Sequence, residues 1–207
     1  MASAPARPYH HGNLRQALVE ATLALAAEGG PESVSVRAAA RRSGVSSGAP
    51  FRHFANRRVL MTAVAEEAMR MLREYIQRSQ RSVRGDDPLQ RLRALGPAYL
   101  RWASCHPTHF RIISARELID FEGSAALKQH NADIRELMQT LLTRAQRIGQ
   151  LRADLDLRQV ELSMRALAYG LARMHIDQHY PQWDVPQRRI EAAASAALDL
   201  FIDGLLA

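Results

Sequence analysis

The chain is poor in cysteine, in aromatic residues and in long apolar runs. Its 207 residues include one cysteine, Cys105, and only 6% of them are aromatic. A single thiol excludes an intrachain disulfide framework and a zinc site built from several cysteines. No apolar run approaches the roughly 20 residues that cross a bilayer, and the first residues lack the apolar segment of a secretory signal. We therefore expect a cytoplasmic protein that needs no cofactor and no membrane.

Signals for β-strands are also scarce. Alternating runs of β-branched and aromatic residues between turn clusters are missing, and alanine and leucine dominate the 47% of residues that are apolar. Apolar positions recur instead at steps of three and four, the spacing of one helix face. The sequence predicts an all-α protein of about nine helices.

Positive charge is concentrated near the N-terminus. Residues 1–58 contain eight arginines and three glutamates, so they carry +5 of the total net charge of +7. A basic module attached to a nearly neutral remainder is typical of proteins that bind a polyanion such as nucleic acid. Charge alone also fits a basic, solvated surface with no partner.

Residues 35–58 have the properties of a helix-turn-helix. Ser35 can cap a helix over 36–43, and Gly44 suits its C-terminal turn because it tolerates left-handed dihedrals. A second short helix is predicted from residue 47 to about 54, starting with small residues that let a backbone approach bases and phosphates. Longer helices are predicted on either side, at residues 13–29 and 56–81. From the pattern alone, an ordinary helical corner remains the alternative.

Residues 35–64 resemble the signature of the TetR family of bacterial transcriptional regulators, and they read SVRAAARRSGVSSGAPFRHFANRRVLMTAV. The shared features are an Arg-bearing helix, a Gly-Val-Ser turn, an aromatic–X–His–Phe recognition helix and a basic residue opening the next helix. Residues 9–30, YHHGNLRQALVEATLALAAEGG, are similar to the first helix of that family. The resemblance covers about residues 9–68, whereas the remainder matches only in architecture.

The resemblance implies which residues contact double-stranded DNA. Arg37 and Arg57 would bind phosphates from the starts of their helices, and the recognition helix would enter the major groove. The predicted DNA-binding residues are Arg37, Ser46, Ser47, Gly48, Phe51, Arg52, His53 and Arg57. Phe51 stands where the family often has tyrosine, so a phenolic phosphate contact is absent, and Pro50 replaces a commonly aliphatic residue. The base sequence recognised is therefore not carried over.

The family's organisation divides the chain into four parts. We expect a flexible arm at 1–12, a helix-turn-helix domain at 13–58, a connecting helix at 59–84 and an effector-binding and dimerisation domain at 85–207. The helices at about 157–179 and 187–205 carry apolar residues on more than one face, the last one adding Ala193, Leu198 and Ile202 to its main stripe. Because both faces must be buried, a homodimer closed by a four-helix bundle is predicted.

Aromatic and sulfur-containing side chains recur on the predicted inner faces of the C-terminal helices. Such residues more often form plain core than a pocket. Effector domains of the TetR family, however, enclose a ligand cavity between these helices. The residues expected to line it are Tyr99, Trp102, Phe110, Phe121, Met138, Leu141, Met164, Leu167 and His175. They predict a mainly apolar or aromatic effector, oriented by a polar group.

Two histidine patterns could suggest other chemistry. His175 and His179 lie four residues apart, which could present two imidazoles to a metal, but no third ligand stands at motif spacing. Cys105 and His106 are adjacent on a helix, so their side chains diverge by about 100° and do not form a dyad. Neither a metal site nor an enzyme is therefore predicted.

The leading functional hypothesis is a repressor. It would bind a palindromic operator as a dimer and release it when a small effector enters the C-terminal domain. The alternative is a nucleoid-associated or division-linked DNA-binding protein of the same fold that has no small-molecule effector.

Overall fold

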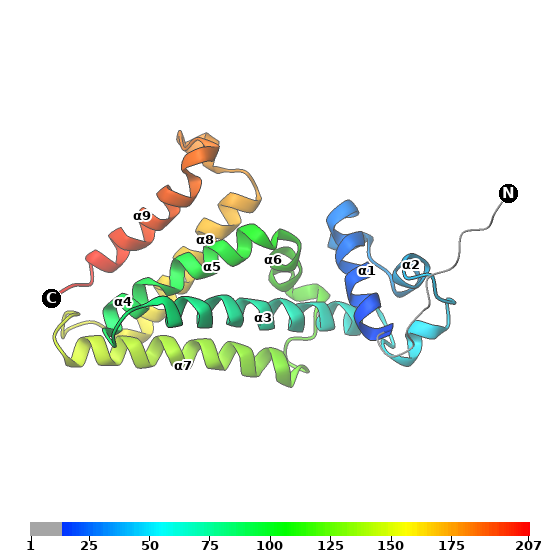
Figure 1. The fold of residues 1–207 in the computed structure, drawn as a ribbon, viewed down its shortest axis with the longest axis horizontal. Helices are drawn as coiled ribbons and strands as arrows, with labels where there is room; N and C mark the ends of the chain where they lie inside the picture. The colour runs from blue at the N-terminus through cyan, green and yellow to red at the C-terminus, as the bar shows by residue number, and fades with distance from the viewer. Residues whose placement is uncertain (1–13) are drawn as a thin grey trace.

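The computed structural model describes residues 14–207, and the chain is helical over this range (Figure 1). The arm expected at 1–12 lies outside the described residues. The α-helices are α1 (Leu14–Gly29), α2 (Val36–Arg42), α3 (Arg57–Ser82), α4 (Pro88–Arg93), α5 (Leu95–Cys105), α6 (Pro107–Ser114), α7 (Ala125–Arg147), α8 (Leu157–Ile176) and α9 (Ile190–Asp203). Short 3₁₀ turns between them are η2 (Pro31–Ser33), η3 (Ala49–Arg52), η4 (Arg116–Leu118), η5 (Tyr180–Trp183) and η6 (Gln187–Arg189). The predicted all-α class is confirmed.

Side-chain caps fix the starts of the N-terminal helices. Ser35 accepts a hydrogen bond from the amide of Ala38 at 3.1 Å and so begins α2. Asn56 accepts one from the amide of Val59 at 3.0 Å and begins α3. Each cap satisfies an amide that would otherwise lack a helical acceptor, which places the helix starts where the sequence predicts them.

Gly44 ends α2 in the predicted way. Its φ is 68°, in the left-handed region that favours glycine. The amide of Gly44 donates to the carbonyl of Arg41 at 3.2 Å, and the amide of Val45 donates to that of Ala40 at 3.1 Å. These two bonds form a Schellman motif, which turns the chain sharply toward the following segment.

The recognition segment is less helical than predicted. In place of a helix over residues 47–54, the structure has the short turn η3 (Ala49–Arg52). Gly48 is a weak helix former and Pro50 lacks an amide hydrogen, so the segment gains few helical hydrogen bonds. Buried Pro50 and buried Phe54 hold the turn at both ends.

The 26-residue helix α3 runs from the N-terminal helices into the larger helical body (Figure 1). Near its start it packs against α1, and further along it packs against α5, α6 and α7. Leu60, Met61 and Leu72 are among its buried side chains, and they belong to one core that continues to α9. None of the described helices combines the length and hydropathy needed to span a bilayer.

The exposed face of helix α9 is not the one that the sequence predicts. Leu198 and Ile202, expected on a second exposed face, are buried in the same chain because α9 packs against α4, α5 and α8. The exposed stripe lies instead at Ala192, Ala196 and Leu200, spaced four residues apart. Leu200 is 75% exposed, so this stripe leaves apolar surface uncovered.

Gly44 and Gly48 provide a matched test of the turn. A Cβ added at either position meets nothing within 4 Å, but φ is 68° at Gly44 and −89° at Gly48. Gly44→Ala should lower the free energy of unfolding by about 1–2 kcal/mol, because an L-residue is strained in the left-handed region. Gly48→Ala should leave it unchanged or raise it by up to about 1 kcal/mol. Urea unfolding followed by circular dichroism measures both, and equal effects would contradict the left-handed turn.

Candidate DNA-binding surface and ligand cavity

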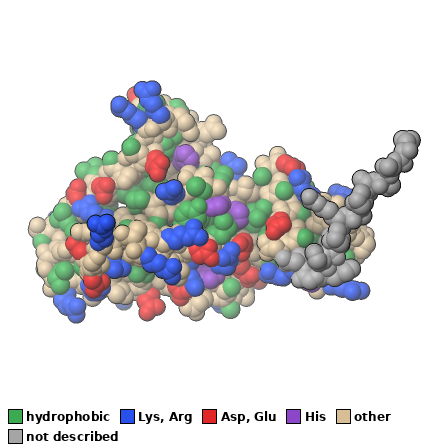
Figure 2. All heavy atoms as spheres, viewed as in Figure 1, with side chains coloured by type: hydrophobic (Ala, Val, Ile, Leu, Met, Phe, Trp, Pro, Cys, Tyr) green, Lys and Arg blue, Asp and Glu red, His purple; other side chains and the backbone are tan. Residues whose placement is uncertain are grey.

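The segment between α2 and α3 is exposed at one end of the molecule, away from α4, α7 and α9 (Figure 1). Most of the predicted DNA-binding residues lie on this surface with exposed side chains or backbone: Arg37, Ser46, Ser47, Gly48, Phe51, Arg52 and His53. Phe51 is 45% exposed, so its ring is accessible on this surface. Over the helical body, by contrast, basic and acidic side chains are interspersed on the visible face (Figure 2).

Arg57 is placed differently from the other predicted DNA-binding residues. Its side chain is half-buried, and Nη2 donates to the carbonyl of Pro31 at 2.8 Å. Arg57 therefore ties the start of α3 to the turn after α1. The neighbouring Arg58, which sequence reasoning missed, has a side chain that is 60% exposed and only a distant ion pair, 3.8 Å, with Asp120. Two adjacent arginines are indistinguishable in sequence, and only the packing shows which one faces solvent.

Arg42 is neutralised within the N-terminal helices by an ion pair. Arg42 donates from both terminal nitrogens to the carboxylate of Glu28, each at 2.6 Å. The hydrogen bonds from Arg42 lower the pKa of Glu28. This pair clamps α2 to the end of α1, so Arg42 contributes less positive charge to the surface than its neighbours do.

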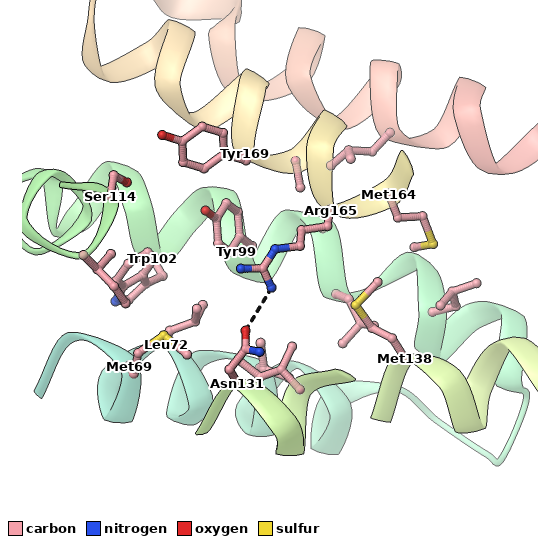
Figure 3. A pocket seen from close by; sticks show the side chains of 18 of the residues that line it. Met69, Leu72, Tyr99, Trp102, Ser114, Asn131, Met138, Met164, Arg165 and Tyr169 are labelled. Atoms are coloured by element: carbon pink, nitrogen blue, oxygen red, sulfur yellow. Dashed lines mark hydrogen bonds between the residues drawn. The ribbon is translucent and has the colours of Figure 1, made fainter. Parts of the chain in front are cut away.

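A cavity of about 560 Å³ lies among α3, α5, α7, α8 and α9 (Figure 3). Its volume is within the usual range for small-molecule sites. Most of its wall is apolar, from Met69, Leu72, Ile76, Leu92, Leu95, Ile113, Ile134, Leu198, Phe201 and Ile202 together with the predicted residues described below. The cavity thus has the predominantly apolar lining that is typical of ligand pockets.

The predicted lining residues divide into two groups. Tyr99, Trp102, Phe121, Met138 and Met164 line the cavity. Phe110, Leu141, Leu167 and His175 do not.

Packing explains why Phe110 and Leu141 lie elsewhere. Phe110 is fully buried behind the wall, with its ring centroid 6.2 Å from that of Trp102 and 5.5 Å from that of Tyr169. Leu141 is 2% exposed and fills the core on α7, one turn beyond Met138. Helical periodicity identifies inward positions but does not tell a residue beside a void from one in solid core.

Arginines in the cavity wall are the residues that sequence reasoning missed. Arg165 on α8 donates from Nη1 to Oδ1 of Asn131 on α7 at 3.1 Å (Figure 3). The Arg116 guanidinium lies 3.6 Å from the centroid of the Phe121 ring. Arg93 pairs with aspartates of α9. In the sequence, the indication of a wall position was that Arg165 directly follows Met164, at the edge of the apolar stripe of its helix.

Two aromatic side chains bring polar groups to the cavity. Burial raises the pKa of Tyr99 well above its ordinary value, so its hydroxyl stays protonated. Within residues 14–207 that hydroxyl has no hydrogen-bond partner, and neither does the buried Nε1 of Trp102. Both groups are neutral donors, which suits them to orient a ligand.

Helix α6 connects the two candidate sites. Its Phe110 packs behind the cavity wall, and the helix also contacts α1, η2 and α3. At its start, Nε2 of His106 lies 3.2 Å from the Tyr75 hydroxyl of α3, and burial lowers the pKa of His106. A displacement at the cavity wall can therefore reach the N-terminal helices through direct contacts.

Two family profiles match the chain. Residues 18–64 match bacterial regulatory proteins of the tetR family, and residues 92–201 match the tetracyclin repressor-like C-terminal domain. The chain belongs to the TetR family. TetR-family proteins are transcription regulators rather than enzymes, with a DNA-binding helix-turn-helix and a ligand-binding C-terminal domain, and they usually act as dimers. The family resemblance predicted from the sequence is confirmed.

Solved structures share the fold of this TetR-family protein over nearly its whole length. A protein of unknown function from Rhodococcus sp. RHA1 has a TM-score of 0.80 and 25% identity, covering 98% of this chain and 100% of that one. The fatty acid degradation regulator FadR from Bacillus halodurans has a TM-score of 0.72 and 16% identity, with coverages of 95% and 98%. The ketosteroid transcriptional regulator KstR2 of Mycobacterium tuberculosis has a TM-score of 0.70 and 20% identity, covering 96% of this chain and 97% of that one. No curated protein has significant similarity to the sequence.

Proposed function

We propose that this TetR-family protein is a repressor that binds a palindromic DNA operator as a homodimer and is released by a small, mainly apolar or aromatic effector. The observation that carries the proposal is the cavity of about 560 Å³, whose wall includes α3, the same helix that begins next to the recognition segment. The alternative, a DNA-binding protein without an effector, gives this cavity no role. The division into DNA binding before residue 58 and effector binding after residue 85 forms part of the proposal.

In the proposed complex, the exposed segment around η3 enters the major groove. Ser46, Ser47, Gly48, Phe51, Arg52 and His53 face bases and flanking backbone, and Arg37 binds a phosphate. Arg57 lies near the phosphates and acts mainly as a positioning residue, because its guanidinium already donates to the carbonyl of Pro31. Arg58, beside it and exposed, offers its charge to a phosphate.

Exposed apolar residues on α8 and α9 support the proposed dimer. Leu162 is 59% and Leu200 is 75% exposed. Each belongs to a row of exposed residues at helical spacing: Leu162, Ala166 and Tyr169 on α8, and Ala192, Ala196 and Leu200 on α9. Alanines in such rows allow close helix approach, so two copies of the helix pair can form a four-helix bundle.

The DNA part of the proposal predicts a salt-dependent effect of Arg37. Arg37→Gln should weaken binding to every DNA sequence and reduce the slope of log affinity against log salt by about one, because one phosphate contact is lost. Arg81→Gln, an exposed arginine at the far end of α3, is the matched control and should change neither quantity. Fluorescence anisotropy at several salt concentrations measures both variants on a fragment selected from random DNA. If the parent protein binds that fragment no better than random DNA, the repressor proposal fails.

The dimer part of the proposal is tested by light scattering. At micromolar concentration the parent protein should have twice the chain mass of 23.2 kDa. Leu200→Arg should shift it toward the monomer, because a charge would be buried in the bundle without a partner. Ile148→Arg, at a position that is 57% exposed beyond the end of α7, should leave the dimer intact. A parent protein of single chain mass would contradict the proposed assembly.

A further inference from the structure

The cavity wall carries positive charge without an acidic counterpart. Its lining includes Arg93, Arg116 and Arg165, and none of the described lining residues is Asp or Glu. Arg93 is neutralised by ion pairs with Asp199, at 3.1 Å, and with Asp203. Arg116 and Arg165 form no ion pair with any residue in the range 14–207. Both side chains are exposed, so their charges are accessible to a ligand in the cavity that brings negative charge.

Arg165 is placed to receive that charge. Its only hydrogen bond to a described side chain goes to the neutral amide of Asn131, which uses one of five guanidinium N–H donors. Both residues also border a second hollow between α7 and α8, which is lined mostly by polar and charged residues and includes Arg158. Arg165 therefore stands where the apolar cavity meets a polar edge.

The one acidic residue of that hollow is already engaged. Glu161 accepts hydrogen bonds from Nε of Arg135 and from Nε2 of Gln139, both at 2.9 Å. Arg165 forms no ion pair with Glu161, although its charge acts on that carboxylate from one helical turn away. Arg116 has a different companion, since its guanidinium lies over the ring of Phe121 and gains a cation–π contact there. Arg116 and Arg165 are thus each left with one neutral contact, and Arg165 is the one that lies beside Tyr99 (Figure 3).

Tyr99 adds a neutral donor in the same part of the cavity. Figure 3 shows its ring on α5 next to the Arg165 side chain, and the two residues are close enough for the charge of Arg165 to act on the Tyr99 phenol. The protonated hydroxyl has no acceptor among the described residues, so it can donate to an anion held by Arg165. Apolar side chains such as Met69, Leu72 and Met138 lie beyond this pair.

We propose that the effector is an amphipathic organic anion. Its carboxylate or phosphate head binds Arg165 and Tyr99 at the edge between α7 and α8, and its apolar body fills the cavity. This inference rests on the proposed function and adds the chemical class of the effector. A neutral ligand of the same shape would gain no ion pair with Arg165, so it binds more weakly.

Direct binding to a protein with one tryptophan tests the proposal. The chain has two tryptophans, and Trp183 is 72% exposed, so Trp183→Phe leaves Trp102 in the cavity wall as the reporter. Dodecanoate, dodecyl phosphate and dodecan-1-ol are titrated against the fluorescence of Trp102. At least one of the two anions should bind about tenfold or more tightly than the alcohol, since it gains charge-assisted hydrogen bonds. The tighter anion identifies the head group.

Substitutions on α8 assign the preference to Arg165. Arg165→Gln should remove the preference for the anion while changing the affinity for dodecan-1-ol by less than about twofold, and Arg165→Lys should restore part of it. Arg173→Gln, whose arginine lies on the same helix and pairs with Asp177, should retain the full preference. Arg116→Gln should retain most of it.

Three outcomes would overturn the proposal: equal binding of alcohol and anions by the parent, binding of none of the three compounds, or an unchanged preference in Arg165→Gln. Circular dichroism checks that each variant is folded. Because the titration contains no DNA, a protein that lacks a specific operator would refute the repressor proposal without affecting this result. Intact operator binding together with no anion preference would refute only the effector class.

Discussion

Burial of the apolar face of α3 is the constraint on which the rest of the structure depends. Near its start, fully buried Leu60 and Met61 belong to the core against α1, and further along Leu72 and Ile76 form part of the cavity wall. A single helix of 26 residues thus runs from the N-terminal helices to the cavity. Since a packed helix moves as a rigid element, a shift in one half must be accommodated in the other.

Helix α6 adds a second mechanical connection to the one that α3 provides. Phe110 packs against Trp102 and Tyr169 behind the cavity wall, while the same helix contacts α1 and the turn η2. Arg57 ties that turn to the start of α3 through the carbonyl of Pro31. In the proposed repressor, an effector that binds the DNA-incompetent arrangement more tightly would act through these contacts. A coupling of about 1–3 kcal/mol lowers operator affinity about 5–150-fold.

Local chemistry made much of the fold predictable from the sequence. Ser35, Gly44 and Asn56 determine helix ends through their own hydrogen bonds or dihedrals, so the starts of α2 and α3 and the end of α2 follow from residue type. The recognition segment was overpredicted because the small, polar residues before Phe51 fit a helix start, whereas the weak helix former Gly48 and the shortness of the segment favour a 3₁₀ turn.

The cavity was less predictable because it depends on long-range packing. Met138 and Leu141 stand on the same inward stripe of α7, yet one borders the cavity and the other fills solid core. Arg165 looks like a solvated arginine in sequence, and only the approach of α7 to α8 reveals its place in the wall. Charge in a cavity is thus a property of the packed chain, which helical periodicity does not encode.

The central claim is that the cavity and the DNA-binding segment are thermodynamically linked. The most direct measurement uses the anion that the Trp183→Phe protein binds more tightly, dodecanoate or dodecyl phosphate. Its affinity is measured with and without saturating operator DNA, and the affinity for the operator is measured with and without that anion at saturation. The account predicts that each ligand weakens the other by the same factor, within about 5–150-fold, because linkage between two binding sites is reciprocal. Two affinities that are each unaffected by the other ligand would contradict it.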